Sequence, residues 1–156
     1  MKKVLLILVS LVLILTFSSS YSEYDLSSFP LLFSNEFADI YFDSIIIKSD
    51  EMQVYCLCNN KTDKDLSFRM KRFLVNGWDV VSSSLFDGFF RVSANSKKRD
   101  CFEFEHAVSV SGISDPDVIT NIDFTLELKS WTGSEIIFEQ TDYTHFDFAD
   151  DASNPE

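Results

Sequence analysis

The three cysteines are the side chains of this chain best suited to covalent chemistry. Cys56 and Cys58 are separated by one residue, and Cys101 lies on a later segment. Residues two apart on a strand point to the same face, with Cα atoms about 6.6 Å apart and parallel Cβ vectors. That separation is near the upper limit for a disulfide, so a bond between Cys56 and Cys58 is disfavoured.

Strand parity determines which other disulfides are open. If Leu57 on one strand and Phe102 on the other face the core, all three cysteines face outward. The two strands would be neighbours in one sheet of a sandwich. Two possibilities stay open: a disulfide from Cys101 to Cys58 or to Cys56 with one thiol left over, or three free thiols.

No motif predicts a metal centre or a catalytic site. Zinc sites usually use Cys-x-x-Cys, whereas this chain has Cys-x-Cys, with His106 expected on the opposite strand face from Cys101. The chain has no Gly-x-Ser-x-Gly elbow and no Asp-x-Asp-x-Asp-Gly calcium loop, although Asp115-Pro116-Asp117 places two carboxylates together. We therefore predict no catalytic, metal-binding or cofactor-binding residues, and no enzymatic activity.

Two further features are candidates for binding. Trp78 and Trp131 could offer an aromatic platform to a sugar, but we expect both rings to pack in the core. The basic run Lys97-Lys98-Arg99 could contact an anion, and we expect it at the tip of a hairpin.

The first 22 residues have the organisation of a secretory signal peptide. A pair of lysines precedes an apolar run over 4–17, and small residues follow over 18–22. The apolar run is shorter than the roughly 20 residues that a membrane-spanning helix needs. We expect cleavage after Ser20 or Ser22, with an uncleaved anchor as the alternative. No cysteine lies near either position, so we expect a secreted or cell-surface protein without a lipid anchor.

The part that remains is acidic and rich in phenylalanine. It has about 134 residues, the usual size of one domain, and loss of the two N-terminal lysines changes the formal charge from −12 to −14. Such a surface repels nucleic acid and anionic lipid, so we expect no nucleic-acid partner and only transient membrane contact through the signal peptide. The whole chain has sixteen phenylalanines, and all but Phe17 lie in this part, which is too many for a disordered chain and predicts a compact core.

Alternation of apolar and polar residues predicts a succession of short strands. It is regular over 66–70 and 122–128, and it slips at Lys71-Arg72, which predicts a β-bulge. Asn76-Gly77 lies between apolar runs and is a strong hairpin signal, because both turn positions need positive φ. Roughly seven to eight strands with regularly spaced turns are typical of an all-β, immunoglobulin-like antiparallel sandwich.

The same pattern sets the domain boundaries. We expect a signal peptide over 1–22, an irregular segment over 23–40 with a short helical turn near 35–40, the sandwich over 41–148, and an acidic tail over 149–156.

Several of these motifs occur together in a known group. The order of motifs resembles small extracytoplasmic immunoglobulin-like β-sandwich domains of uncharacterised secreted proteins and lipoproteins of Gram-positive bacteria. The residues that carry the resemblance are 58–65, 73–78, 96–98, 122–128 and Trp131. The resemblance spans 42–138 and implies a fold but no site residues. Such domains usually carry an outward charged residue where this chain has Cys58, which makes Cys58 the better of the two partners for Cys101.

These observations favour a binding or structural module over an enzyme. We expect an exported, non-enzymatic sandwich at the cell surface, with an unknown protein or other surface ligand as its partner and no cofactor. Two alternatives stay open: a small secreted enzyme whose site the sequence does not reveal, and a thiol- or metal-responsive protein that uses the cysteines.

Overall fold

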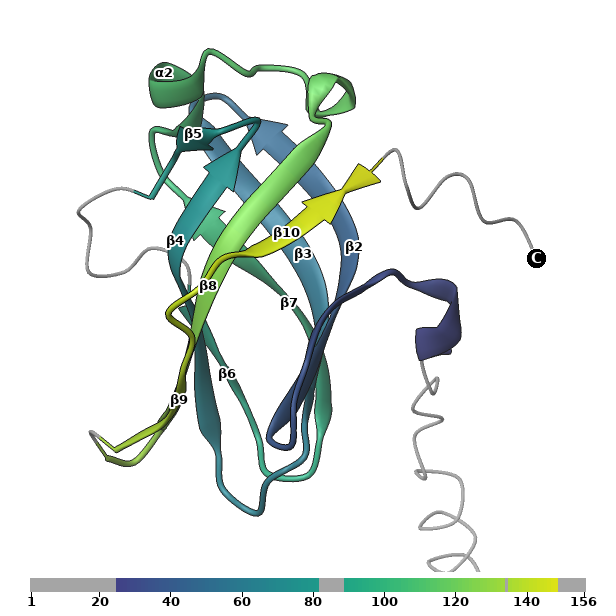
Figure 1. Cartoon of the computed structure of the whole chain (residues 1–156), viewed down its shortest axis with the longest axis vertical. Coiled ribbons are helices and arrows are strands. Elements are labelled where there is room, and N and C mark those ends of the chain that lie inside the picture. Colours follow the sequence, from purple (N-terminus) through teal and green to yellow (C-terminus); the bar gives the residue numbers. More distant parts are fainter. Residues whose placement is uncertain (1–24, 82–88, 134, 149–156) are drawn as a thin grey trace, which may run out of the picture.

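The computed structural model describes residues 25–81, 89–133 and 135–148. Figure 1 shows the strands arranged as two stacked sheets, with the short helix α2 at one end. The elements are η1 (Leu26–Ser28), β1 (Leu31–Ser34), β2 (Ala38–Lys48), β3 (Glu51–Asn60), β4 (Leu66–Val75), β5 (Trp78–Asp79), β6 (Phe89–Val92), β7 (Lys97–Phe104), α2 (Ala107–Ser111), η2 (Pro116–Val118), β8 (Asn121–Ser130), β9 (Ile136–Glu139) and β10 (Thr144–Asp147).

The first sheet, sheet A, has the strand order β1-β2-β3-β7. β2 and β3 form a hairpin whose two-residue turn begins at Ser49, which has a φ of 57°. β7 pairs with β3 from Met52 to Asn59, whereas β1 pairs with β2 only as far as Tyr41. β1 and β7 are therefore the outer strands of sheet A, and β1 covers only the first part of β2.

The second sheet, sheet B, is built around β4 and β8. β8 pairs with β4 on one side and with β9 and β10 on the other, and β4 also pairs with β5 and β6. The chain thus places β2, β3 and β7 in one sheet and β6, β4, β8 and β10 in the other. This is the connectivity of an immunoglobulin-like sandwich, so the expected fold class is confirmed. β1, β5 and β9 are short additions to it.

The segment over 23–40 is more regular than expected. Instead of a helical turn near 35–40, it contains β1 and the start of β2 at Ala38. Asn35 explains the difference, because its Oδ1 accepts hydrogen bonds from the backbone N–H groups of Phe37 and Ala38, both at 2.8 Å. This closes a tight turn between two strands. The sandwich therefore begins before residue 41.

The turn and bulge predictions around β4 are confirmed. Asn76 and Gly77 have φ values of 49° and 81° and join β4 to β5. The register between β4 and β8 shifts between Met70 and Arg72, where the bulge was expected.

Phenylalanines from both sheets form the core. Phe73 of β4 stacks on Phe104 of β7 with ring centroids 4.5 Å apart, and Phe102 of β7 lies 4.6 Å from Phe90 of β6. Full burial of such a side chain stabilises the fold by about 1.5–3 kcal/mol. Apolar burial between the sheets therefore holds the sandwich together.

Two predicted segments lie outside the described residues, the signal peptide over 1–22 and the acidic tail over 149–156. Within the described ranges, no helix combines the length and apolar character needed to cross a membrane.

Candidate functional site

The cysteines do not lie on one face of sheet A. Cys56 and Cys58 point into the core and are 0% and 1% exposed. Cys101 lies opposite Tyr55 in the register of β3 with β7, and this outward-facing pair is half-buried. The expected disulfide from Cys101 to Cys58 or Cys56 is therefore wrong, and all three thiols are free.

The error lies in the facing of β3. Val54 is fully buried and lies opposite Phe102, which is also fully buried. Since side chains alternate along a strand, Cys56 and Cys58 share the inward face of Val54. Leu57 faces outward and is nevertheless only 1% exposed.

Burial makes these thiols poor nucleophiles. It raises the pKa of Cys56 and Cys58 well above the ordinary thiol value. Burial, followed by the charge of Glu103, raises the pKa of Cys101 to about 11. Because the thiolate is the reactive form, none of the three is suited to nucleophilic or redox chemistry in the folded chain.

Each histidine is paired with an aspartate. His106 Nδ1 lies 2.9 Å from Asp50 Oδ2, and His145 Nδ1 lies 2.7 Å from Asp123 Oδ1. The Ser109 hydroxyl donates to Asp50 Oδ2 at 2.9 Å, and the Ser109 backbone N–H donates to Asp50 Oδ1 at 2.6 Å. In a catalytic serine the hydroxyl gives its proton to an imidazole, whereas the Ser109 hydroxyl donates to the carboxylate of Asp50. The two hydrogen bonds from Ser109 show that Asp50 anchors α2.

The remaining polar candidates do not gather into a site either. Among the described residues, no three side chains of His, Cys, Asp or Glu are grouped so that they could hold a metal ion.

The two tryptophans lie at opposite ends of β8. Contrary to the expected core packing, Trp78 is 56% and Trp131 43% exposed. Trp78 follows the hairpin turn at Asn76, whose N–H donates to Asn121 at the start of β8, whereas Trp131 follows the end of that strand. A strand of ten residues spans about 33 Å, so the rings cannot form one platform.

Within the described residues, the second half of β2 has no neighbouring strand on the side away from β3. β1 pairs with β2 up to Tyr41, and just beyond it the N–H of Phe42 donates to Pro30 O at 2.8 Å. From Asp43 to Lys48, no strand of the described chain pairs with β2 on the side away from β3. We call Asp43–Lys48 the open edge. Its three consecutive isoleucines favour the extended backbone.

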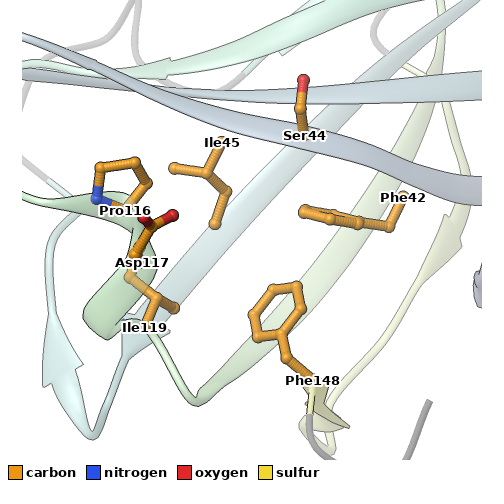
Figure 2. A pocket seen from close by; sticks show the side chains of 7 residues that line it. All are labelled: Phe42, Ser44, Ile45, Pro116, Asp117, Ile119 and Phe148. Atoms are coloured by element: carbon orange, nitrogen blue, oxygen red, sulfur yellow. The ribbon is translucent and has the colours of Figure 1, made fainter. Parts of the chain in front are cut away.

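A groove of about 220 Å³ lies beside the open edge, between β2 on one side and η2, Ile119 and the residue after β10 on the other. We call it the edge groove. It is lined by Phe42, Ser44, Ile45, Pro116, Asp117, Ile119 and Phe148. In Figure 2 the side chains of Phe42, Ile45, Ile119 and Phe148 converge, whereas Ser44 rises from the opposite side of its strand.

Three partly buried aromatic rings form the apolar part of the edge groove and its surroundings. Phe42 lies 5.0 Å from Phe148 and 6.0 Å from Phe146, and Phe146 lies 5.1 Å from Phe148, measured between ring centroids. These rings come from β2 in one sheet and from β10 and the residue after it in the other. Such a surface favours contact with an apolar side chain.

The turn η2 forms the other wall of the edge groove, and Asn76 holds it in place. Asn76 Nδ2 donates to Val118 O at 3.0 Å, and its Oδ1 accepts from the N–H of Thr120 at 2.9 Å. Asp115 caps η2, because its Oδ1 accepts from the N–H of Asp117 at 3.0 Å. The carboxylate of Asp117 is therefore placed at the rim of the groove (Figure 2).

The opposite edge of sheet A is protected. Lys98 and Asp100 lie on the outer strand β7, on the same side as the core residue Phe102, and pair at 2.5 Å. Lys98 Nζ also donates to the backbone oxygen of Arg91 on β6, at 3.1 Å, and so connects the two sheets. Inward-facing charges discourage further strand pairing. The basic run over 97–99 thus belongs to an edge strand, not to a hairpin tip.

Comparisons with known proteins add no family. No family model matches the chain, and no curated protein matches its sequence. Among solved structures, the chain is similar to the yeast GGA1 GAE domain, with 12% identity and a TM-score of 0.35, over 74% of this chain and 96% of that one. A protein from Archaeoglobus fulgidus is similar at 10% identity and a TM-score of 0.34, over 73% and 97% of the two chains. The fold assignment rests on the strand connectivity described above.

The edge groove was not among the sites expected from the sequence. Its residues come from β2, from η2 and the residue after it, and from the residue after β10, and no spacing rule connects these segments. One signal was present in the sequence. A strand that is covered on one face only alternates apolar with polar residues, whereas Ile45-Ile46-Ile47 is a continuous apolar run, which indicates apolar surroundings on more than one side.

Proposed function

We propose that this protein is an exported, non-enzymatic β-sandwich that binds another protein at the cell surface through the open edge and the edge groove. An origin among the secreted domains of Gram-positive bacteria is part of the proposal, based on the sequence resemblance. The observation that carries it is the placement of an unpaired strand edge beside an apolar groove, on a sheet whose opposite edge is protected.

The size and chemistry of the edge groove support binding over catalysis. Its volume of about 220 Å³ is below the range of roughly 300–1,000 Å³ that is usual for small-molecule sites. Asp117 is its charged lining residue, whereas the side chain of Ser44 rises from the opposite side of its strand and donates to Asp43. Neither histidine lines it. A groove of this kind suits one or two side chains of a partner.

Export is the second part of the proposal and has its own test. The signal peptide predicts that the protein recovered outside the cell starts at Tyr21 or Glu23. N-terminal sequencing of the extracytoplasmic fraction measures this directly. Recovery of the protein only in membranes, with Met1 retained, contradicts cleavage.

Site-specific photocrosslinking tests the binding surface. A photoreactive amino acid is placed at Ser44 on the open edge, or at Ser67 on β4, and cells that export each variant are illuminated. Both serines are half-buried and lie on strands, but in different sheets, so Ser67 is the matched control. We expect a crosslinked second protein from position 44 only. No product from position 44, or equal products from both positions, contradicts the proposal.

A further inference from the structure

We propose that the open edge takes up an extended, basic segment of the partner protein as an added strand, with an apolar side chain of that segment seated in the edge groove. The inference rests on the proposed function and names the chemistry of the partner.

The backbone of the open edge is arranged to pair with another strand. In an antiparallel ladder, successive residues alternately point their N–H and C=O groups toward one neighbour and then the other. The two-residue turn makes Lys48 and Glu51 a hydrogen-bonded pair, so Ile46 also bonds toward β3, opposite Gln53. Ile45 and Ile47 then direct their N–H and C=O groups away from β3, to the side where the described chain has no strand.

The bulge in β2 agrees with this assignment. The N–H of Phe42 points toward β1, since it donates to Pro30 O. The register of β2 with β3 shifts between Phe42 and Ser44, which changes the alternation by one residue. Before the bulge, the residue whose N–H group points away from β3 is Phe42. After the bulge, the residues whose backbone groups point away from β3 are Ile45 and Ile47. The N–H of Phe42 is bonded to Pro30, just before β1, whereas the outward backbone groups of Ile45 and Ile47 have no strand beside them in the described chain.

The edge groove supplies side-chain recognition beside this backbone. Phe42 and Ile45 extend from β2 toward Ile119 and Phe148 (Figure 2). A strand added to β2 continues sheet A past this opening, and every second side chain of that strand faces the groove. Backbone hydrogen bonds give such a complex its affinity, and the pocket for alternate side chains gives it specificity.

Charge selects a basic segment. The charged side chain lining the groove is Asp117, which is exposed, and Asp115 lies two residues before it. Lys48, at the end of the open edge, directs its Nζ to Gln53 Oε1 at 3.4 Å. The whole chain carries a formal charge of −12, so a second copy of it would be repelled. A lysine- or arginine-containing partner is attracted instead.

Amide hydrogen exchange with defined peptides tests the inference in the purified exported protein. The first peptide alternates lysine with valine and isoleucine, the second replaces each lysine by glutamate, and the third is the lysine peptide with alternate backbone nitrogens methylated. We expect the lysine peptide to slow exchange at Ile45 and Ile47 at least tenfold, because their amides gain partners. Exchange at Ile46 stays unchanged, which provides the internal control. The other two peptides should give no protection.

Charge variants complete the experiment. Asp117→Lys should weaken binding of the lysine peptide about threefold to tenfold. Asp63→Lys carries the same change of charge in the turn between β3 and β4, away from the groove residues, and should leave binding within about twofold. Thermal unfolding of both variants verifies that they fold.

Four results would overturn the inference: equal protection by the glutamate peptide, protection by the methylated peptide, protection at residues other than the open edge, or a dimer in sedimentation that the lysine peptide does not dissociate. The photocrosslink from Ser44 reports separately on the proposed function. A crosslinked partner together with failure of the lysine peptide leaves the function standing and rejects only the partner chemistry.

Discussion

The two edges of sheet A belong to the same fold but are built in opposite ways. β7 carries inward-facing charges at Lys98 and Asp100, and Lys98 reaches across to β6. The second half of β2 carries isoleucines and borders a groove. Exposed strand edges invite unwanted pairing, and proteins usually protect them. The contrast between the two edges agrees with the binding role proposed for the open edge.

Packing follows the same division. On β7, Phe102 and Phe104 are fully buried between the sheets. Beside the open edge, Phe42, Ile45 and Phe148 are only partly buried. Partly buried apolar side chains contribute less to stability in the isolated chain and keep area that a partner can cover. The protected edge therefore serves stability, and the open edge is available for binding.

The largest expected effect separates the two edges by stability. Phe102→Ala should lower the free energy of unfolding by about 3–5 kcal/mol, as is usual for removal of a fully buried ring. Phe148→Ala should lower it by only about 1 kcal/mol, because its ring is partly exposed already. Urea unfolding of both variants measures the difference. Equal losses would remove the distinction between the two edges.

The wall of the edge groove gives the second prediction. Asn76→Ala removes side-chain bonds to η2 and places alanine at a φ of 49°, so we expect a loss of about 2 kcal/mol. Asn76→Gly keeps the backbone conformation accessible and isolates the hydrogen-bond contribution. Crosslinking from Ser44 should fall in both variants. Normal crosslinking with a displaced unfolding midpoint would show that η2 is not part of the binding surface.

Acid should loosen the covered half of β2. Asp39 accepts hydrogen bonds from Ser34 on β1 and Asn59 on β3, and it pairs with Lys61. Burial alone would raise the pKa of Asp39, but these partners together lower it below 3.8. The resulting stabilisation is present above pH 3.8 and is lost as the pH falls through the lowered value.

Asp39→Asn provides the test of that pH dependence. The variant should be less stable near neutral pH and should show a flatter decline in the urea midpoint below pH 3.8 than the native chain. Parallel curves for the two proteins would show that Asp39 does not fasten β1 to β2.

Removal of the charge that protects β7 should make the edges more alike. Lys98→Met keeps much of the side-chain volume and removes the pair with Asp100, which is exposed enough to be worth less than about 1 kcal/mol. We expect nearly unchanged stability and a new concentration-dependent self-association in sedimentation velocity. A variant that stays monomeric at high concentration would show that charge is not what protects β7.

The smallest effect concerns the outer face of β7. With its pKa at about 11, Cys101 should react with iodoacetamide at pH 8 roughly ten- to a hundredfold more slowly than a free thiol. Cys56 and Cys58 should react only after unfolding. Mass spectrometry of the unreduced protein should find three thiols, and detection of a disulfide would contradict the strand facing described here.

The sequence predicts sheet B better than sheet A, for a physical reason. On β8, Ile122, Phe124 and Leu126 alternate with polar residues, so only one facing buries the apolar set. On β3, one orientation of the strand buries Met52 and Val54 and the other buries Tyr55 and Leu57, so both orientations bury apolar side chains. Pairing with Phe102 decides between them, and that contact is long-range.

The open edge and the edge groove are less predictable still. The open edge exists because β1 is too short to cover β2, and β1 itself depends on the Asn35 turn. The groove exists because Asn76, in the turn after β4, holds η2 opposite the β2 residues that line the groove. The open edge depends on where β1 ends, and the groove depends on a contact between residues distant in the sequence. Composition and periodicity predict neither of these.

The buried thiols have a consequence for the time before the protein is folded. On the export proposed above, the chain crosses the membrane unfolded, and its three cysteines then meet an oxidising compartment as accessible thiols. Sandwiches fold slowly, over milliseconds to seconds, because their strand pairs join distant parts of the chain. Burial of Cys56 and Cys58 must therefore outpace their oxidation. In the folded chain, burial between the sheets and not a disulfide is what keeps Cys56 and Cys58 from cross-linking one molecule to another.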